Sequence, residues 1–290
     1  MSSPINSARR LRILVPTDLS AASRAGLRFA IQWSRQRPAE LLFVHVVNIP
    51  KPPAWTEKEY KIYFDSQCSQ YRQRLKTFVR NIYRQVGVPQ RNSTFLLLEA
   101  ISADVALQDY CQQDRHIDFI CMSTRGAGRM KRLFGTHTGN LITHSKVPVL
   151  AVPSTYRARP IRRLLYAGDM IDYDQELRKV LEFARPLNAG IDLLHLTEAG
   201  EIALDKKMTE KIFREQFNYP FRIHFRQPDQ SLSFPENLNK QILAFKPSVV
   251  ILFTDQRRSI LARIVHPSKA EKLSFDLKAP LLVFSQQISR

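Results

Sequence analysis

The sequence predicts an α/β protein made of two open, five-stranded parallel-sheet domains, each with helices on both faces of its sheet. The chain has 290 residues, which suits two domains of ordinary size. Short apolar runs alternate with amphipathic segments of helical period, as they do when right-handed crossovers join parallel strands. The pattern of the first half then returns in the second half. The predicted domains are therefore residues 1–154 and 161–290.

In the first half, predicted strands and helices follow each other in strict alternation. Residues 12–16 form a short apolar strand, and the apolar positions after them recur at helical spacing behind Ser20, a candidate helix cap. Residues 41–47 are a continuous apolar run, as expected for a strand covered on both faces. A long amphipathic helix follows, with its apolar positions between Tyr60 and Val86. The remaining elements are expected at residues 94–98 (strand), 104–114 (helix), 117–122 (strand), 136–145 (helix) and 147–152 (strand).

The second half repeats this organisation. Residues 162–169 resemble residues 10–18, because each is a basic-flanked apolar run that ends on an aspartate. A stretch with a proline at each end, residues 153–160, is the expected linker. Further strands are expected at residues 191–196, 221–225, 249–253 and 281–284.

A fixed offset aligns the two halves near their ends. Shifting the sequence by 132 residues lays Lys146-Val-Pro148 on Lys278-Ala-Pro280 and the strand 119–122 on residues 251–254 without a gap. Such self-similarity indicates an internal repeat.

The charge of the chain is strongly positive and unevenly distributed. With 44 Lys or Arg against 26 Asp or Glu, the formal net charge is +18. Residues 1–160 contain 24 of the basic and 10 of the acidic side chains, which places +14 of the charge in the first half. Such a field attracts anions, either nucleic acid, an acidic lipid surface or a phosphorylated small molecule. Charge alone does not choose among them.

Several classes of protein receive no support from the sequence. The cysteines, Cys68, Cys111 and Cys121, share no disulfide or zinc-ligand spacing, and the histidines include no HExxH motif. No apolar run reaches the length of a membrane span, and the first residues lack a signal-peptide core. We therefore expect a cytosolic protein without a membrane span, a disulfide framework or a metal centre.

A glycine-bearing loop is the strongest candidate for a ligand site. With the expected strand order 3-2-1-4-5 in each sheet, ligands bind beyond the carboxyl ends of strands one and four, where the strand order reverses. The loops expected there are residues 16–18 and 123–136. The second loop carries three of the nine glycines, is rich in arginine and lysine, and ends at a helix start, so its backbone N–H groups predict a phosphate site. A solvated turn is the alternative, since neither a Walker A nor a GxGxxG motif is present.

Four motifs give the chain a resemblance to a known family. They are Ile13-Leu-Val-Pro-Thr-Asp18, Val44-His-Val46, the loop from Ser123-Thr-Arg-Gly126 to Phe134-Gly135-Thr136, and Val147-Pro-Val-Leu-Ala-Val152. Together they resemble the universal stress protein family in its tandem, two-domain form. The resemblance implies an adenine nucleotide alpha hydrolase-like fold, and ATP as ligand, with AMP or ADP as alternatives and Mg²⁺ accompanying the phosphates near Asp18.

The resemblance also assigns roles to residues. Asp18 and Val46 would face the base, Met122 and Ser123 the ribose, and Gly126, Gly135 and Thr136 the phosphates. The rest of the candidate set is formed by their neighbours in the same motifs: Pro16, Thr17, Arg125, Gly128 and His137. Two positions depart from the family loop G-x2-G-x9-G-[ST]. Ser123 replaces its first glycine, and eight residues instead of nine separate Gly126 from Gly135.

The second half is expected to keep the fold and lack the nucleotide site. Under the offset of 132, the loop glycines Gly126 and Gly135 fall opposite Arg258 and Pro267, so the backbone freedom for phosphate binding is missing there. Asp169 remains as a turn or cap residue. In the family, domains pair through their last strands, so the strands at 147–152 and 281–284 are expected to pair within one chain, while a homodimer stays open.

Three functions follow from this reading. The first is a cytosolic stress or signalling protein that binds ATP in its first domain. Because no nucleophile–base set or carboxylate pair is visible, an efficient enzyme is not expected, and only slow ATP hydrolysis stays open. The second is a nucleotide-free adaptor that uses the fold as a protein-binding surface. Nucleic-acid binding ranks third, because no recognition motif accompanies the charge.

Overall fold

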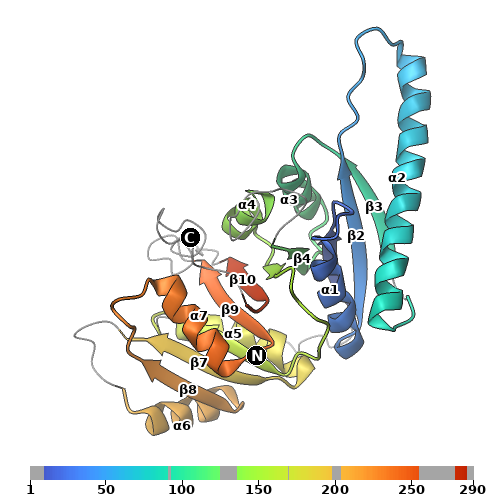
Figure 1. The fold of residues 1–290 in the computed structure, drawn as a ribbon. Coiled ribbons are helices and arrows are strands. Elements are labelled where there is room, and N and C mark those ends of the chain that lie inside the picture. The colour runs from blue at the N-terminus through green and yellow to red at the C-terminus, as the bar shows by residue number, and fades with distance from the viewer. Residues whose placement is uncertain are drawn as a thin grey trace, which may run out of the picture.

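The computed structural model describes residues 10–90, 93–124, 136–168, 170–197, 204–254 and 278–285 (Figure 1). Its strands are β1 (Leu11–Pro16), β2 (Ala39–Val47), β3 (Ser93–Glu99), β4 (Phe119–Ser123), β5 (Val149–Val152), β6 (Arg163–Ala167), β7 (Gly190–Leu196), β8 (Phe221–Arg226), β9 (Val249–Thr254) and β10 (Leu281–Ser285). Its α-helices are α1 (Arg24–Gln36), α2 (Glu57–Val86), α3 (Ala103–Gln113), α4 (Thr136–His144), α5 (Tyr173–Ala184), α6 (Lys206–Phe217) and α7 (Phe234–Phe245), with a short 3-10 helix at Arg185–Leu187.

The strands form one ten-stranded sheet. Its order is β3-β2-β1-β4-β5-β10-β9-β6-β7-β8, so the predicted α/β class and the order 3-2-1-4-5 of the first five strands are confirmed. The second five strands have the same order, counted from β6. Neighbouring strands are parallel within each half, whereas β5 and β10 are antiparallel, with Leu282 opposite Leu150. The two edges that would otherwise be open thereby pair with each other.

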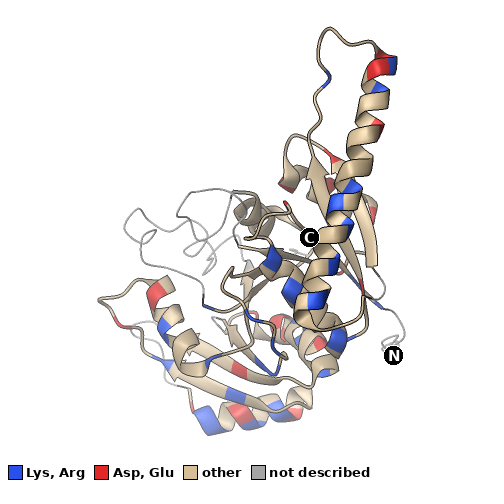
Figure 2. Cartoon of the chain, turned by 45° about the vertical axis from the view of Figure 1, so that its right-hand side comes forward, with Lys and Arg blue, Asp and Glu red and all other residues tan. Residues whose placement is uncertain are grey.

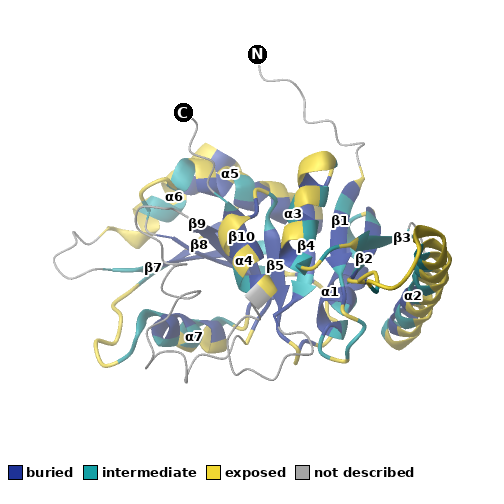
Figure 3. Cartoon of the chain, turned by 90° about the horizontal axis from the view of Figure 1, so that it is seen from above, coloured by how far each residue is buried: buried dark blue, intermediate teal, exposed yellow. Residues whose placement is uncertain are grey.

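Each face of the sheet has its own apolar core. The helices α1, α2, α5 and α6 pack on one face, and α3, α4 and α7 pack on the other. The first core crosses from one half to the other, because the fully buried Trp33 of α1 packs against Phe119 of β4 and Phe183 of α5, with ring centroids 5.0 and 5.1 Å apart. Figure 3 shows the strands as the buried centre of the molecule and the exposed residues on the outer sides of the helices.

Helix α1 begins later than the sequence predicts. It starts at Arg24 with Ser23 before it, so the expected cap at Ser20 is wrong. Instead, Ser20 Oγ accepts the Ser23 N–H at 3.3 Å and Ser23 Oγ donates to the Ser20 carbonyl at 2.9 Å. This local turn takes up the residues that a cap at Ser20 would have placed in the helix.

Helix α2 is longer than the strands beside it. Its 30 residues extend for about 45 Å, so its N-terminal turns project beyond the sheet, as Figure 1 shows. A capping box begins the helix, with the Thr56 hydroxyl accepting the Glu59 N–H and the Glu59 carboxylate accepting the Thr56 N–H. Gly87 ends it in the left-handed conformation, at φ 72°.

The strand order of the first half recurs in the second half, but the single offset of 132 is wrong for β9. The Ile120 N–H donates to the Pro148 carbonyl and the Val250 N–H to the Pro280 carbonyl, each in the same place of its half. Val149 and Leu281 are therefore 132 residues apart, while their partners Ile120 and Val250 are 130 apart. A slip of two residues leaves every side chain on the same face of the sheet, so the apolar pattern does not reveal it.

Candidate functional site

The carboxyl ends of β2, β1 and β4 lie side by side where the strand order reverses. Pro16 is opposite Val44 on β2, and Leu14 is opposite Ile120 on β4. The Thr17 N–H continues the ladder by donating to the Val44 carbonyl at 2.9 Å. This edge brings together the described candidate residues from the loops after β1 and β4, as the strand order predicts.

The candidate residues divide between the two faces of this edge. Met122 packs with the core that includes Leu14 and Val44, so alternation places Pro16 and Val46 on that same side, with α3 and α4. Val46 and Met122 are half-buried. They therefore offer partly exposed apolar surface that a bound ligand could cover.

The polar groups of Thr17 all bond to protein atoms. The residue is buried. Its hydroxyl oxygen lies 2.7 Å from Ser23 Oγ and accepts the Leu19 N–H at 3.0 Å. Its carbonyl oxygen accepts a hydrogen bond from His45 Nδ1 at 2.8 Å. Thr17 therefore shapes the loop after β1.

Asp18 is the exposed member of the β1 loop. Its Oδ1 accepts the Ser20 N–H at 2.9 Å, which forms a turn closed by the side chain. Between them, Leu19 is held in the left-handed region at φ 63°, where residues other than glycine are uncommon. The turn fixes the Asp18 carboxylate at the carboxyl edge of the sheet.

Ser123 is held by helix α1 on one side and helix α4 on the other. Its hydroxyl oxygen accepts the Gly26 N–H at 2.9 Å, and its carbonyl accepts a hydrogen bond from Thr138 Oγ1 at 3.2 Å. The residue is buried, at 6% exposure. A contact of Ser123 with the ribose, which the sequence predicts, therefore stays a prediction, and the hydroxyl already has a structural use.

His137 belongs to a polar cluster that the sequence does not reveal. Its Nδ1 lies 2.6 Å from Oδ1 of Asp104, while Oδ2 of Asp104 accepts from Asn140 Nδ2 at 2.7 Å. The Ser102 hydroxyl donates to Oδ1 as well. Asp104 is 5% exposed, and its burial alone would raise its pKa, but the hydrogen bonds from Ser102, Asn140 and His137 lower the pKa to about 2. The carboxylate joins the starts of α3 and α4.

Sequence reasoning missed Asp104 because its signal is ambiguous. A Ser-x-Asp at the start of a helix indicates an N-cap region, and Ser102 does precede α3. The partners His137 and Asn140 lie 33 and 36 residues further along the chain. Only the packing of α3 against α4 brings them together.

The remaining candidate residues lie outside the described residues. Arg125, Gly126, Gly128 and Gly135 belong to the predicted phosphate loop between residues 124 and 136, and Thr136 is described only as the first residue of α4. Asp169, Arg258 and Pro267 of the second half are also outside them. Their roles stay predictions.

The second half repeats one hydrogen bond found at the carboxyl edge of the first half, but the side chains around that bond differ. His195 Nδ1 donates to the Gly168 carbonyl at 3.0 Å, as His45 does to Thr17. Beneath Gly168, however, the fully buried Tyr166 donates its hydroxyl hydrogen to Glu176 of α5. A Cβ on Gly168 would meet the Tyr166 side chain, so this ring fills the space below the edge.

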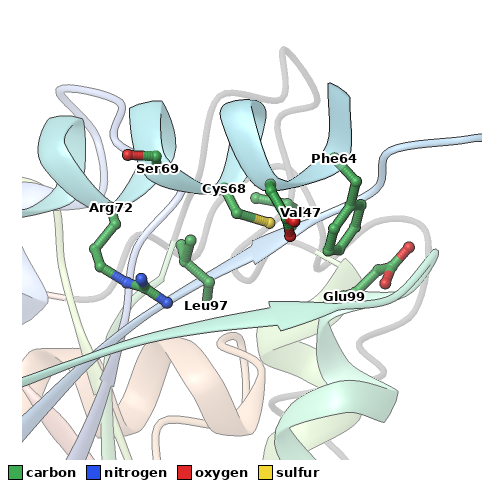
Figure 4. A pocket seen from close by; sticks show the side chains of 8 residues that line it. Val47, Phe64, Cys68, Ser69, Arg72, Leu97 and Glu99 are labelled. Carbon is green, nitrogen blue, oxygen red and sulfur yellow. The ribbon is translucent and has the colours of Figure 1, made fainter. Parts of the chain in front are cut away.

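A cavity of about 450 Å³ opens between α2 and the carboxyl ends of β2 and β3. It is lined by apolar and charged side chains: Val47, Phe64, Asp65, Cys68, Ser69, Arg72, Leu97 and Glu99. Figure 4 shows Cys68 pointing from the helix towards the strands, between Arg72 and Phe64. None of the candidate nucleotide residues lines this cavity.

The thiol of Cys68 should react slowly. Burial raises its pKa, the Glu99 and Asp65 carboxylates raise it further, and Arg72 opposes them. Because the thiolate is the nucleophile, we expect alkylation by iodoacetamide at pH 8 to be slower than that of glutathione, and Glu99→Gln to accelerate it. The measurement is the alkylation rate against pH, read by mass spectrometry at Cys68. The buried Cys111 and Cys121 provide unreactive controls, and a Cys68 that titrates below free cysteine contradicts the assignment.

Among the described residues, no group of three or more His, Cys, Asp or Glu side chains is arranged to hold a metal ion. No helix in the same part of the chain is both long and apolar enough to cross a membrane.

Comparisons with known proteins bear on the family and the fold. A model of the universal stress protein family matches residues 10–153. A universal stress protein from Archaeoglobus fulgidus is 16% identical, with 96% of this chain and 97% of that chain covered and a TM-score of 0.65. A protein of unknown function from Pseudomonas aeruginosa is 15% identical, with 96% and 93% covered and a TM-score of 0.53.

Another solved structure is a universal stress protein in complex with cAMP. It is 18% identical, with 50% of this chain and 98% of that chain covered and a TM-score of 0.37. A search of curated proteins finds no match. The likeness to the Archaeoglobus and Pseudomonas proteins shows the fold.

Proposed function

Since residues 10–153 make this chain a member of the universal stress protein family, we propose that its first half binds an adenine nucleotide, with ATP as the expected ligand. The observation that carries the proposal is the edge formed by the carboxyl ends of β2, β1 and β4, with Asp18, Val46 and Met122 on it at the reversal of strand order. In the proposal Asp18 and Val46 face the base, Met122 lies on the ribose side, and Asp18 also helps to hold a Mg²⁺ ion carried by the phosphates.

The start of α4 supports the phosphate end of the proposed site. The helix begins at Thr136, directly after the glycine-bearing loop, and its unpaired N–H groups favour an anion. His137 is half exposed there and is tied to Asp104 through Nδ1. In the proposal Asp104 orients His137, whose other ring nitrogen is directed away from the carboxylate.

The second half has no comparable loop in this proposal. After Gly200 the sequence contains no glycine at all, so the region after β9 lacks glycine whichever offset, 130 or 132, relates the two halves. We therefore propose one nucleotide per chain, and a stress or signalling role in which the second half stabilises the first through the pairing of β5 with β10.

Nucleotide binding is tested by titration calorimetry with ATP, ADP and AMP, with and without Mg²⁺. We expect Asp18→Ala to weaken ATP binding on the order of tenfold to a hundredfold, because hydrogen bonds to charged groups contribute about 1.5–3 kcal/mol. The matched control is Asp109→Ala, which removes an exposed carboxylate from α3. Absence of heat with all three nucleotides at millimolar concentration contradicts the proposal, as does equal weakening by the control.

One observation favours the nucleotide-free adaptor as a second candidate. The polar groups of Thr17 and the hydroxyl of Ser123 already bond to protein atoms, so they do not need a ligand as a hydrogen-bond partner. An adaptor keeps its partner when Gly126 is replaced by a bulky residue, whereas a nucleotide binder loses its ligand.

A further inference from the structure

Three stretches of the chain carry many basic residues and no Asp or Glu. They are residues 19–39, 66–98 and 119–168, with four, six and nine Lys or Arg residues respectively. If the three stretches were also far apart in the fold, each would be an ordinary solvent-exposed surface. Only their arrangement in space tells whether their charges act together.

The fold places parts of all three stretches on one side of the molecule. Helices α1 and α2, from the first two stretches, pack on the same face of the sheet. The connection after β5, from the third, lies against α1, because the Tyr156 ring packs on Phe29 with centroids 5.3 Å apart. In Figure 2 the lower half of α2 shows blue segments, and its red segments lie towards the upper end.

The centre of this side is a cluster of arginines. The Arg24 guanidinium lies over the Phe78 ring of α2, 5.7 Å from its centroid, so it bridges the two helices. Its buried Nε has no hydrogen-bond partner among the described residues. Arg28 is one turn further along α1, and burial together with the charges of Arg157 and Arg24 lowers the pKa of Arg28. Like charges are thus held close together.

Helix α2 extends the cluster. Arg74, whose guanidinium lies 5.5 Å from the Tyr71 ring centroid, is exposed, as are Arg80 and Arg84. No ion pair joins any of these arginines, or those of the cluster, to a carboxylate within the described ranges. We name this surface the basic face, and it consists of Arg24, Arg28, Arg74, Arg80, Arg84 and Arg157.

We propose that the basic face binds the phosphodiester backbone of a nucleic acid. From Arg74 to Arg84 the helix rises about 15 Å, and at 3.6 residues per turn the three arginines spread over about 120° of its outward side, so they offer several contacts to a phosphate backbone. A lipid surface fits less well, because peripheral membrane binding also inserts apolar side chains. The exposed apolar residues of α2, Ile62 and Tyr63, lie near its other end. The proposal does not depend on the proposed nucleotide site, because Val46 and Met122 lie on the face of the sheet covered by α3 and α4, whereas α1 and α2 cover the other face.

The test is fluorescence anisotropy with a labelled single-stranded RNA of about 20 nucleotides and a DNA duplex of about the same length, from about 25 to about 300 mM KCl. The full-length chain is compared with a variant carrying Arg28→Gln, Arg74→Gln and Arg157→Gln. The logarithm of the binding constant falls linearly with the logarithm of the salt concentration, and each phosphate contact contributes about 0.7 to this slope for a single strand and about 0.9 for a duplex. Removing three arginines should therefore reduce the magnitude of the slope by about 2 for the RNA and by about 2.7 for the duplex. At fixed salt, affinity should fall on the order of tenfold.

The matched control removes the same charge elsewhere. Lys207→Gln, Lys211→Gln and Arg214→Gln replace three exposed basic residues of α6, in the other half, and should leave the slope unchanged. Since Arg28 is half-buried, the double variant Arg74→Gln with Arg157→Gln repeats the test with exposed positions only. Circular dichroism checks that each variant is folded.

Each outcome either supports or overturns the proposal. Loss with the basic-face variant and not with the control supports the proposal, and the stronger of the RNA and duplex signals identifies the source of the phosphates. Equal loss with both variants shows attraction by net charge and overturns it. So does absence of binding at the lowest salt. Binding of phosphatidylserine vesicles that needs the basic face, without binding of either nucleic acid, overturns it in favour of a membrane.

Discussion

Gly26→Val is expected to destabilise the fold by about 3 kcal/mol or more and to disrupt the carboxyl edge of β4. A Cβ at Gly26 would lie 2.8 Å from both the Met122 carbonyl carbon and the Ser123 nitrogen. These are backbone atoms of a central strand, which have no rotamer by which to move away. The larger side chain therefore forces α1 off the sheet, and the Gly26 N–H to Ser123 hydrogen bond is lost with it.

The stability change is measured by urea unfolding followed by circular dichroism. Gly190→Ala is the matched control, because a Cβ there meets nothing closer than the Arg162 carbonyl oxygen at 3.9 Å. We expect this control to stay within about 0.5 kcal/mol of the parent chain. A Gly26→Val variant as stable as the control would show that α1 and β4 are not held at this distance. If the variant folds, its weakened ATP binding would link helix packing to the proposed site.

Asp104→Asn is expected to lower the free energy of unfolding at pH 7 by about 2 kcal/mol. The pKa of Asp104 is lowered from 3.8 to about 2 in the folded chain, so the native state favours the carboxylate more than the unfolded chain does. The amide keeps the shape and turns an N–H towards groups that already donate, Asn140 and His137. The side chain is buried, so water does not replace the lost partner.

The pH dependence of stability shows whether the ionised form of this carboxylate stabilises the fold. A lowered pKa contributes stability that is fully present above pH 4 and is lost as the pH falls towards 2. The difference between parent and Asp104→Asn should therefore shrink over that range, as followed by urea unfolding at several pH values. Asp109→Asn, an exposed position on the same helix, is the control and should show no such change. A difference that does not depend on pH contradicts the ionised, hydrogen-bonded assignment.

Much of the fold follows from local patterns. The apolar runs predict each described strand to within about two residues, because a strand covered on both faces has few polar positions. The errors occur where side-chain bonding competes with the helix, as at Ser20, and where two alignments bury the same face, as at β9. The candidate site divides in the same way. Asp18, Val46 and Met122 follow from strand ends, while Asp104 and the occupied hydroxyl of Ser123 do not.

Periodicity and residue type within short segments predict the order of the elements, the parallel strands and the half that carries the glycine loop. Three features appear only in the folded chain: the close approach of Gly26 to β4, the groups that Asp104 holds together, and the shared side of the arginines from α1, α2 and the connection after β5. Such features join residues from different elements. Their energies come from distances and burial between segments, and one-dimensional patterns do not encode those distances.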